Sequence, residues 1–216
     1  MSERIFVLIL MMAFVIVSCK EDSESLGAGV LHLENQNTYH LRFYNLPEPS
    51  AKEAFSVNLF NDSERVGVQT SLRPPMDSVK FNPLYLVPQQ SVLVLQVVKT
   101  SGSWAQVVTD KNNGLLHWIK HNDLVVEPWK DFILSTYNIK PLSQNSNPLL
   151  DQPGKQGHVL LENLNSTCLS PISVQGDWMK VRNTPGECDN DSNIQTPFEG
   201  FIRWKEQGHL LISFSL

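Results

Sequence analysis

The sequence has few cysteines, no excess of basic charge and no long hydrophobic span. Of its 216 residues three are cysteine and 18% are charged, and the formal net charge is -5. A protein that binds nucleic acid through its phosphates needs a basic stripe, and here the basic residues are scattered, so we expect no nucleic-acid partner. Hydrophobic residues make up 41% of the chain, which is enough for globular cores. No segment keeps a helical period with caps, so we predict an all-β protein.

Sequence motifs for catalysis and metal binding are also missing. The chain has no Gly-x-Ser-x-Gly motif and no glycine-rich phosphate loop, and its six histidines show no metal-ligand spacing on a shared face. The run from Asp189 to Asn193 resembles the start of a calcium-binding EF-hand loop. However, Ile194 stands where that loop needs glycine and Gly200 where it needs glutamate, so a polar turn explains the run better. We predict no enzymatic activity, no catalytic residue, no metal and no cofactor.

The N-terminus carries a targeting signal. Arg4 precedes an apolar run from Ile5 to Val17, which is shorter than the roughly 20 residues that a transmembrane helix needs. The run ends at Ser18-Cys19, which resembles a bacterial lipobox and predicts a lipid anchor on Cys19. We therefore expect a lipoprotein that is held to a membrane of the bacterial cell envelope, on its periplasmic or outer side. An ordinary secretory signal and an uncleaved anchor are the alternatives.

The other two cysteines are consistent with the same cellular location. If Cys19 takes the lipid, Cys168 and Cys188 remain as an even pair in an oxidising compartment, so we predict a disulfide between them. That bond would close a loop of about 20 residues and contribute roughly 3 kcal/mol in the loop-entropy model. Two reduced thiols are the alternative.

Two strand motifs occur twice along the chain. Gly102-Ser103-Trp104-Ala105-Gln106-Val107 aligns without a gap with Gly176-Asp177-Trp178-Met179-Lys180-Val181, and the strand that begins at Gly114 aligns with the one that begins at Gly200. In this second alignment Trp118 corresponds to Trp204. Glycine-led strands repeated in tandem predict two copies of one small β domain.

These motifs resemble bacterial SH3-like (SH3b) domains. The resemblance rests on the opening Tyr137-Asn138-Ile139-Lys140 in the second copy and Thr70-Ser71-Leu72-Arg73-Pro74 in the first, on the Gly-x-Trp-x-x-Val strand, and on Gly200-Phe201-Ile202. It implies two small barrels of about five strands each over residues 66 to 216. The first copy has Leu115-Leu116 where the family carries an aromatic residue, which weakens a ligand site in that copy.

The sequence therefore predicts five segments. The region before the first copy has strand-like alternation and is either a separate small β domain or a β extension of the first copy. The segments are a signal peptide (1–18), a polar tether (19–29), an N-terminal β region (30–65), a first SH3-like repeat (66–128) and a second (132–216).

The alternation of the shared Trp strand predicts which of its side chains are exposed. Successive side chains of a strand point to opposite faces, so Met179 and Val181 share one face and Trp178 and Lys180 the other. The aliphatic pair is expected in the core, which leaves Trp178, and by the same argument Trp104, on the wetter face as ligand-binding candidates. A tryptophan that covers its own barrel is the alternative.

The Gly200 strand has the opposite order. Ile202 and Trp204 share the face that we predict to be core, and Phe201 and Arg203 share the other. A guanidinium binds carboxylates bidentately, so Arg203 beside Phe201 is a candidate for peptide recognition. A solvated face is the alternative.

Taken with the resemblance, these residues suggest a binding or scaffolding protein of the cell envelope. By resemblance the ligand is a peptidoglycan peptide or another envelope protein. An accessory subunit of a surface complex, with no affinity for the cell wall, is the second hypothesis, and a cell-wall hydrolase is the third.

Overall fold

The computed structural model describes most of the chain from residue 26 onward. Cys19, the predicted signal peptide and most of the predicted tether lie outside the described residues. The described ranges are 26–34, 39–61, 66–71, 81–87, 90, 92–121, 124–142, 147–162, 164, 167–183 and 197–216.

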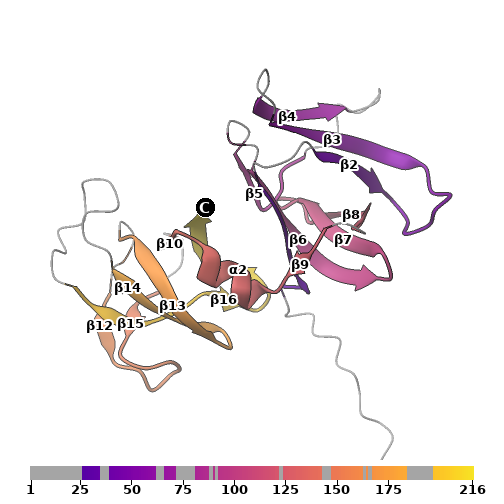
Figure 1. Cartoon of the computed structure of the whole chain (residues 1–216). Coiled ribbons are helices and arrows are strands. Elements are labelled where there is room, and N and C mark those ends of the chain that lie inside the picture. Colours follow the sequence, from indigo (N-terminus) through magenta and orange to yellow (C-terminus); the bar gives the residue numbers. More distant parts are fainter. Residues whose placement is uncertain are drawn as a thin grey trace, which may run out of the picture.

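The described chain is built almost wholly from antiparallel strands, which confirms the predicted β class. Two large sheets lie at opposite ends of the molecule, with one short helix, α2, between them (Figure 1). The first sheet contains β1 (Gly29–Leu33), β2 (Tyr39–Tyr44), β3 (Glu53–Asn61), β4 (Val66–Ser71), β5 (Tyr85–Val87), β6 (Val92–Ser101), β7 (Trp104–Asp110), β8 (Leu115–Lys120) and β9 (Val126–Glu127). The second contains β10 (Asn138–Pro141), β11 (Leu149–Leu150), β12 (Val159–Leu161), β13 (Leu169–Gln175), β14 (Trp178–Asn183), β15 (Glu199–Arg203) and β18 (Ile212–Ser215).

The two sheets share one strand order. Five strands follow each other as β8-β7-β6-β1-β9 in the first sheet and as β15-β14-β13-β10-β18 in the second. We call these five-strand sets the first unit and the second unit. In chain order, further strands lie between β1 and β6 of the first unit and between β10 and β13 of the second. One of these inserted strands extends each unit at its edge, because β2 pairs with β8 and β11 pairs with β15.

The hairpin that begins each Trp strand is the same in both units. Ser101 pairs with Trp104 and Gln175 with Trp178, so each loop has two residues, and the glycine that begins it has positive φ, 57° at Gly102 and 59° at Gly176. Loops of this length favour a first residue with positive φ, which glycine adopts without steric cost. The first of the two sequence alignments is therefore confirmed in register.

The second alignment is wrong by three residues. Trp118 on β8 pairs with Gln106, two residues after Trp104, and Phe201 on β15 pairs with Lys180, two residues after Trp178. Trp118 therefore corresponds to Phe201 and not to Trp204.

In the first unit the strand that corresponds to β10 is β1, which lies before the predicted opening at Thr70. In the second unit Ile139 of β10 pairs with Leu169, and in the first Leu31 of β1 holds the same position opposite Leu95. The predicted opening near Thr70 lies instead in β4, at the far edge of the sheet, where Thr70 pairs with Val57. Strands β1 to β4 thus belong to the same sheet as β6 to β9, so of the two arrangements that we considered for the N-terminal region the hydrogen bonding favours the extension.

A single helix, α2 (Trp129–Ser135), links the two units, and the sequence analysis did not predict it. Trp129, Phe132 and Ile133 are buried and have the i, i+3, i+4 spacing of one helix face. Pro128 precedes the helix, where its fixed φ suits a helix start. The indole Nε1 of Trp129 donates to the Leu26 carbonyl at 3.1 Å, which ties the helix to the first sheet.

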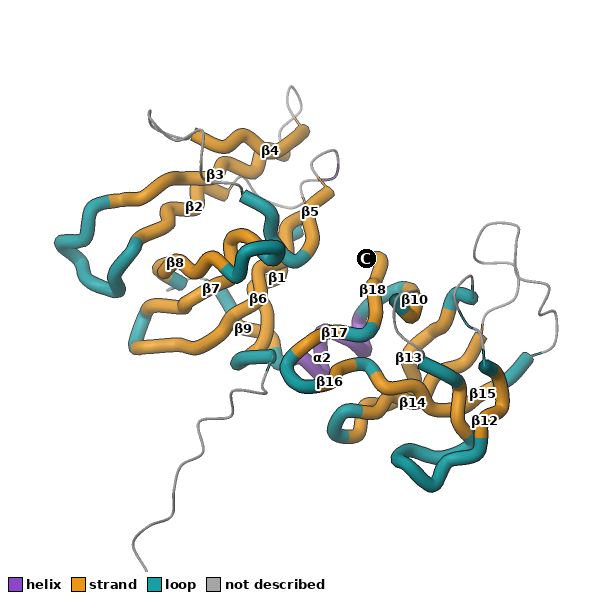
Figure 2. The backbone as a smooth tube through the Cα atoms, turned by 180° about the vertical axis from the view of Figure 1, so that it is seen from behind, coloured by secondary structure: helices purple, strands orange, loops and turns teal. Residues whose placement is uncertain are grey.

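The apolar core crosses from one unit to the other around α2. One cluster of buried side chains contains Val30 and Val94 of the first sheet, Phe132 of the helix, and Ile139 and Trp204 of the second unit. Aromatic contacts cross the same joint, because Phe132 meets His32 at 5.6 Å and Phe214 at 5.0 Å between ring centroids. A second cluster fills the inner face of the first sheet alone (Leu31, Leu33, Leu41, Phe43, Phe55, Val57, Leu93, Leu95, Val97, Ala105, Val107 and Ile119). The reverse view shows α2 with the hairpin of β16 (Lys205–Glu206) and β17 (His209–Leu210) beside it (Figure 2).

Candidate functional site

Strands β14 and β15 present one face to the core. Met179 is paired with Ile202 and Val181 with Gly200, and the side chains of Met179, Val181 and Ile202 are fully buried. Gly200 is glycine for a steric reason, because a Cβ atom there would lie 2.6 Å from Cγ of Leu149. The alternation predicted for these strands is confirmed on this face.

The opposite face brings together four of the five predicted ligand-binding residues. Trp178 is paired with Arg203 and Lys180 with Phe201, and residues paired across two strands point to the same side of a sheet. All four are partly exposed. We call the surface formed by Trp178, Lys180, Phe201 and Arg203 the outer face of the second unit.

Each cation on this outer face has an aromatic or acidic neighbour. The guanidinium carbon of Arg203 lies 5.1 Å from the ring centroid of Trp178, within cation–π range, and its Nη1 donates to Glu206. Lys180 Nζ lies 2.7 Å from Glu199 Oε2, and this contact lowers the pKa of the Glu199 carboxyl. The outer face therefore combines two aromatic side chains with two basic side chains, each of which is paired with a glutamate.

The backbone at Arg203 is held by a side chain from another part of the chain. Asn147 donates from Nδ2 to the Arg203 carbonyl at 2.6 Å and accepts from the Arg203 N–H at 3.0 Å, so its amide occupies the place of a neighbouring strand. Trp204, the next residue, donates from Nε1 to the Gly176 carbonyl at 2.9 Å. The end of β15 and the turn before Trp178 are thereby fixed relative to each other, which positions Arg203 over the indole of Trp178. Sequence reasoning missed Asn147, since no local pattern links it to Arg203.

The first unit has the same arrangement in a closed form. Trp104 pairs with Lys120 as Trp178 pairs with Arg203, and Lys120 Nζ lies 5.9 Å from the Trp104 ring centroid. Trp104 lies on the face opposite Ala105, as predicted, but only 7% of it is exposed. Tyr44 of β2 meets the indole of Trp104 edge-on, with ring centroids 5.3 Å apart and planes at 89°. The predicted exposure of Trp104 is therefore wrong, because a strand from 60 residues earlier in the chain covers it.

Trp118 was aligned with Trp204, which we predicted to be a core residue, but Trp118 lies on the opposite face of its sheet. Ile119 points into the core of the first sheet, so Trp118, its neighbour, points to the other face. It is 8% exposed, and Lys99 Nζ lies 5.7 Å from its ring. Trp204 does lie in the core, at 3% exposure, as the alternation predicts.

No protein family model, curated protein or solved structure matches the chain. The SH3-like resemblance therefore stays a prediction from sequence motifs.

The cysteines are only partly covered by the described structure. Cys168 is buried at 4% exposure just before β13. Cys188 lies outside the described residues, as does Cys19, so the disulfide and the lipid anchor stay predictions.

The described ranges of the chain contain neither a metal-ligand cluster nor a membrane-spanning helix. Within those ranges no group of three or more His, Cys, Asp and Glu side chains is placed to hold a metal ion. The acidic run from Asp189 to Asn193 lies outside them. None of the described helices has the length and apolar character to cross a membrane.

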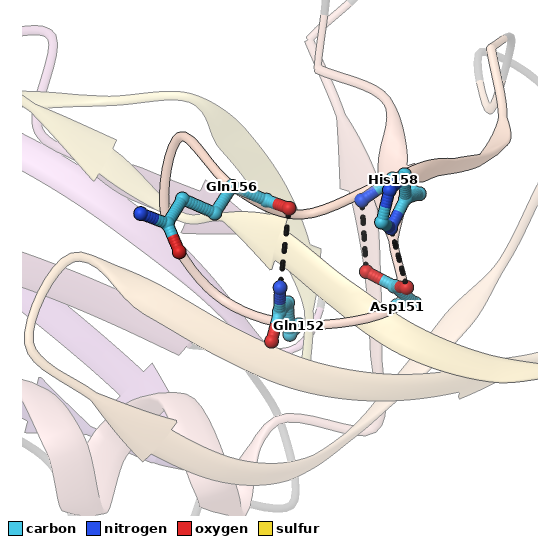
Figure 3. A network of polar contacts seen from close by, with 4 residues as sticks. All are labelled: Asp151, Gln152, Gln156 and His158. Atoms are coloured by element: carbon cyan, nitrogen blue, oxygen red, sulfur yellow. Dashed lines mark hydrogen bonds and ion pairs between the residues drawn. The ribbon is translucent and has the colours of Figure 1, made fainter.

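One further polar cluster lies in the loop between β11 and β12 (Figure 3). Asp151 accepts from the His158 backbone N–H at 2.8 Å and pairs with His158 Nδ1 at 3.1 Å, and these contacts lower the pKa of the Asp151 carboxyl. Gln152 donates from Nε2 to the Gln156 carbonyl at 3.1 Å. These bonds join residues of the same loop, so the cluster stabilises the conformation of that loop.

Proposed function

We propose that this protein is a lipid-anchored binding or scaffolding protein of the bacterial cell envelope, built from two SH3-like units. The outer face of the second unit is its ligand surface. In this account Cys19 carries the lipid, Cys168 and Cys188 form a disulfide, and no residue acts as a catalyst. The ligand is a peptidoglycan peptide or a segment of another envelope protein.

The observation that carries the proposal is the pairing of Trp178 with Arg203 and of Lys180 with Phe201. These four ligand-binding candidates were predicted from two separate sequence motifs, and they lie on one face of one sheet, where all four are partly exposed. Partly exposed aromatic side chains beside arginine are typical of protein recognition surfaces. The equivalent face of the first unit is closed by Tyr44, so the proposal assigns binding to the second unit alone.

The shared strand order supports the tandem SH3-like arrangement. Each unit has five strands, the number that the resemblance implies. Each unit also has a register shift at the same place of one strand. In β6 the shift lies between Val97 and Lys99, and in β13 it lies between Pro171 and Ser173, in both cases beginning two residues after the core-facing Leu95 or Leu169. A bulge in the same place of two strands supports the proposal that the units are copies of one structure. The repeat boundary then falls before β1, with the β2–β5 region as an excursion within the first unit.

Co-sedimentation with purified sacculi tests the proposal. The chain from residue 20 to 216 is mixed with sacculi, with and without an envelope protein extract, and bound protein is measured for the wild type, Trp178→Ala and Arg203→Ala. Tyr137→Ala serves as the control, because Tyr137 is an exposed aromatic residue that directly precedes β10 and lies on neither β14 nor β15. We expect binding of the wild type and the control, and a loss of about tenfold or more in both outer-face variants. Equal binding by all four proteins would contradict the assigned surface.

The extract separates the two kinds of ligand. Binding to bare sacculi indicates a wall peptide, and binding that needs the extract indicates an envelope protein. No binding in either condition would remove the binding proposal.

A further inference from the structure

We propose that the outer face of the second unit binds an aromatic side chain of a polypeptide partner, which meets Trp178 edge-on. This inference rests on the proposed function and names its ligand. The reason is that the first unit already holds such a side chain, its own Tyr44, at the equivalent place.

Tyr44 and the residue at its position in the second unit can be matched through the hydrogen-bonding register. Tyr44 of β2 pairs with Trp118, and Leu150 of β11 pairs with Phe201, which is the counterpart of Trp118. The match extends to the irregularities, because a register shift falls between Phe43 and Tyr44 and another between Leu149 and Leu150. Leu150 therefore stands where the first unit has Tyr44.

In the first unit Tyr44 completes the environment of Trp104. The indole has a cation near one side, Lys120 at 5.9 Å, and the Tyr44 ring edge-on at 5.3 Å. An edge-to-face arrangement is favourable, because the positive edge of one ring meets the negative face of the other. With both neighbours in place only 7% of Trp104 is exposed.

In the second unit the aromatic neighbour is missing from the described structure. Arg203 lies 5.1 Å from the Trp178 ring centroid, and Lys120 lies 5.9 Å from that of Trp104, but no aromatic ring of a described residue packs against Trp178 as Tyr44 does against Trp104. Leu150 is shorter than tyrosine and is itself only 8% exposed. Trp178 accordingly keeps part of its surface open.

The chemistry of the open side favours a neutral aromatic group. Arg203 already occupies the cation position at Trp178 and is paired with Glu206, so a second cation would compete with it for the same ring and the same carboxylate. An aromatic ring needs neither of these partners and buries no new charge. The open side therefore fits tyrosine or phenylalanine of an extended polypeptide segment better than it fits a basic side chain.

NMR of the tryptophan indole N–H resonances tests the inference. The sample is the chain from residue 20 to 216, which contains all residues that the structure describes. The probe is N-acetyl-tyrosinamide, and N-acetyl-leucinamide is the control of similar polarity without a ring. We expect the tyrosine probe to shift the Trp178 resonance about threefold or more further than the leucine probe does, and to leave Trp104 unchanged. Equal shifts with the two probes, or no shift at Trp178, would overturn the inference.

An exchange of the two equivalent residues gives a second, matched readout. Tyr44→Leu opens Trp104 and is expected to make its resonance respond to N-acetyl-tyrosinamide. Leu150→Tyr places a ring beside Trp178 and is expected to abolish the Trp178 response. If Leu150→Tyr does not fold, Tyr44→Leu decides, and a Trp104 resonance that stays silent in that folded variant refutes the equivalence.

The two proposals can fail separately. Sacculus or envelope-protein binding that depends on Trp178, together with no preference for the tyrosine probe, would retain the binding function and remove the aromatic ligand. Loss of both would remove both.

Discussion

Replacing Trp204 with alanine is the sharpest test of how the second unit is packed. Trp204 is 3% exposed and belongs to the core cluster that also contains Trp129 of α2, with 6.2 Å between their ring centroids. Its indole N–H donates to the carbonyl of Gly176, which is exposed, so that carbonyl can bond water when the indole is removed. The main effect of Trp204→Ala is therefore the loss of buried apolar contact.

The burial of Trp204 determines how far Trp204→Ala lowers the free energy of unfolding. Removing a buried tryptophan side chain typically lowers the free energy of unfolding by about 3–5 kcal/mol. With a urea m-value of roughly 2 kcal/mol per molar, this shifts the unfolding midpoint by about 1.5–2.5 M. Trp178→Ala removes a partly exposed indole and one cation–π contact with Arg203, so we expect a loss of about 1 kcal/mol.

Urea unfolding of residues 20–216, followed by circular dichroism, measures both variants beside the wild type. We expect one cooperative transition, because the core runs from Trp204 through α2 to Val30 and Val94 of the first sheet. This differs from two separate tandem domains, which usually unfold independently. A loss in Trp178→Ala equal to that in Trp204→Ala would refute the assignment of the two faces, and two well-separated transitions would refute the shared core.

Three further predictions concern the anchor, the thiols and a buried histidine. Cys19→Ala should release the protein from the membrane fraction and abolish acyl labelling, and continued membrane association after high-salt washing would contradict the lipid anchor. Mass spectrometry of non-reduced, envelope-purified protein should find Cys168 joined to Cys188, whereas two thiols that alkylate freely would exclude the disulfide. Burial lowers the pKa of His117 from its ordinary 6.5, so the unfolded chain takes up this proton first, and the free energy of unfolding should fall as pH drops below about 6.5. His117→Gln should remove this part of the pH dependence, and an unchanged pH profile in that variant would show that other groups cause it.

Local patterns in the sequence were enough to predict the two central strands of the second unit and which of their faces is buried. Alternation placed Met179, Val181 and Ile202 in the core, and the structure confirms this. The glycine-led start of the Trp104 and Trp178 strands was also predicted, because turn geometry depends on neighbouring residues. These features need no knowledge of distant parts of the chain.

Features that depend on distant pairing could not be predicted in this way. The cover on Trp104 comes from Tyr44, and the brace on Arg203 comes from Asn147, 56 residues away in the chain. The gapless alignment that matched Trp118 with Trp204 failed, because only the hydrogen-bonding register shows that Trp118 corresponds to Phe201. A strand's partner is decided by tertiary packing, which single-sequence periodicity does not encode.

The helix α2 is an intermediate case. Its signal was present in Pro128 and in the spacing of Trp129, Phe132 and Ile133. A segment of seven residues gives fewer than two full periods, so it did not stand out among strands. Its stability comes from burial between the two sheets and not from helix propensity.

The central claim is that the second unit binds through its outer face while the equivalent face of the first unit is closed. Lys180 and Gln106 hold the same register position in the two units, opposite Phe201 and Trp118. A photo-crosslinking amino acid placed at each of these positions in turn, in cells, compares the two faces directly. We predict ultraviolet-dependent adducts to a partner or to the cell wall from position 180 and none from position 106. Adducts from position 106 alone, or equal adducts from both, would contradict the claim.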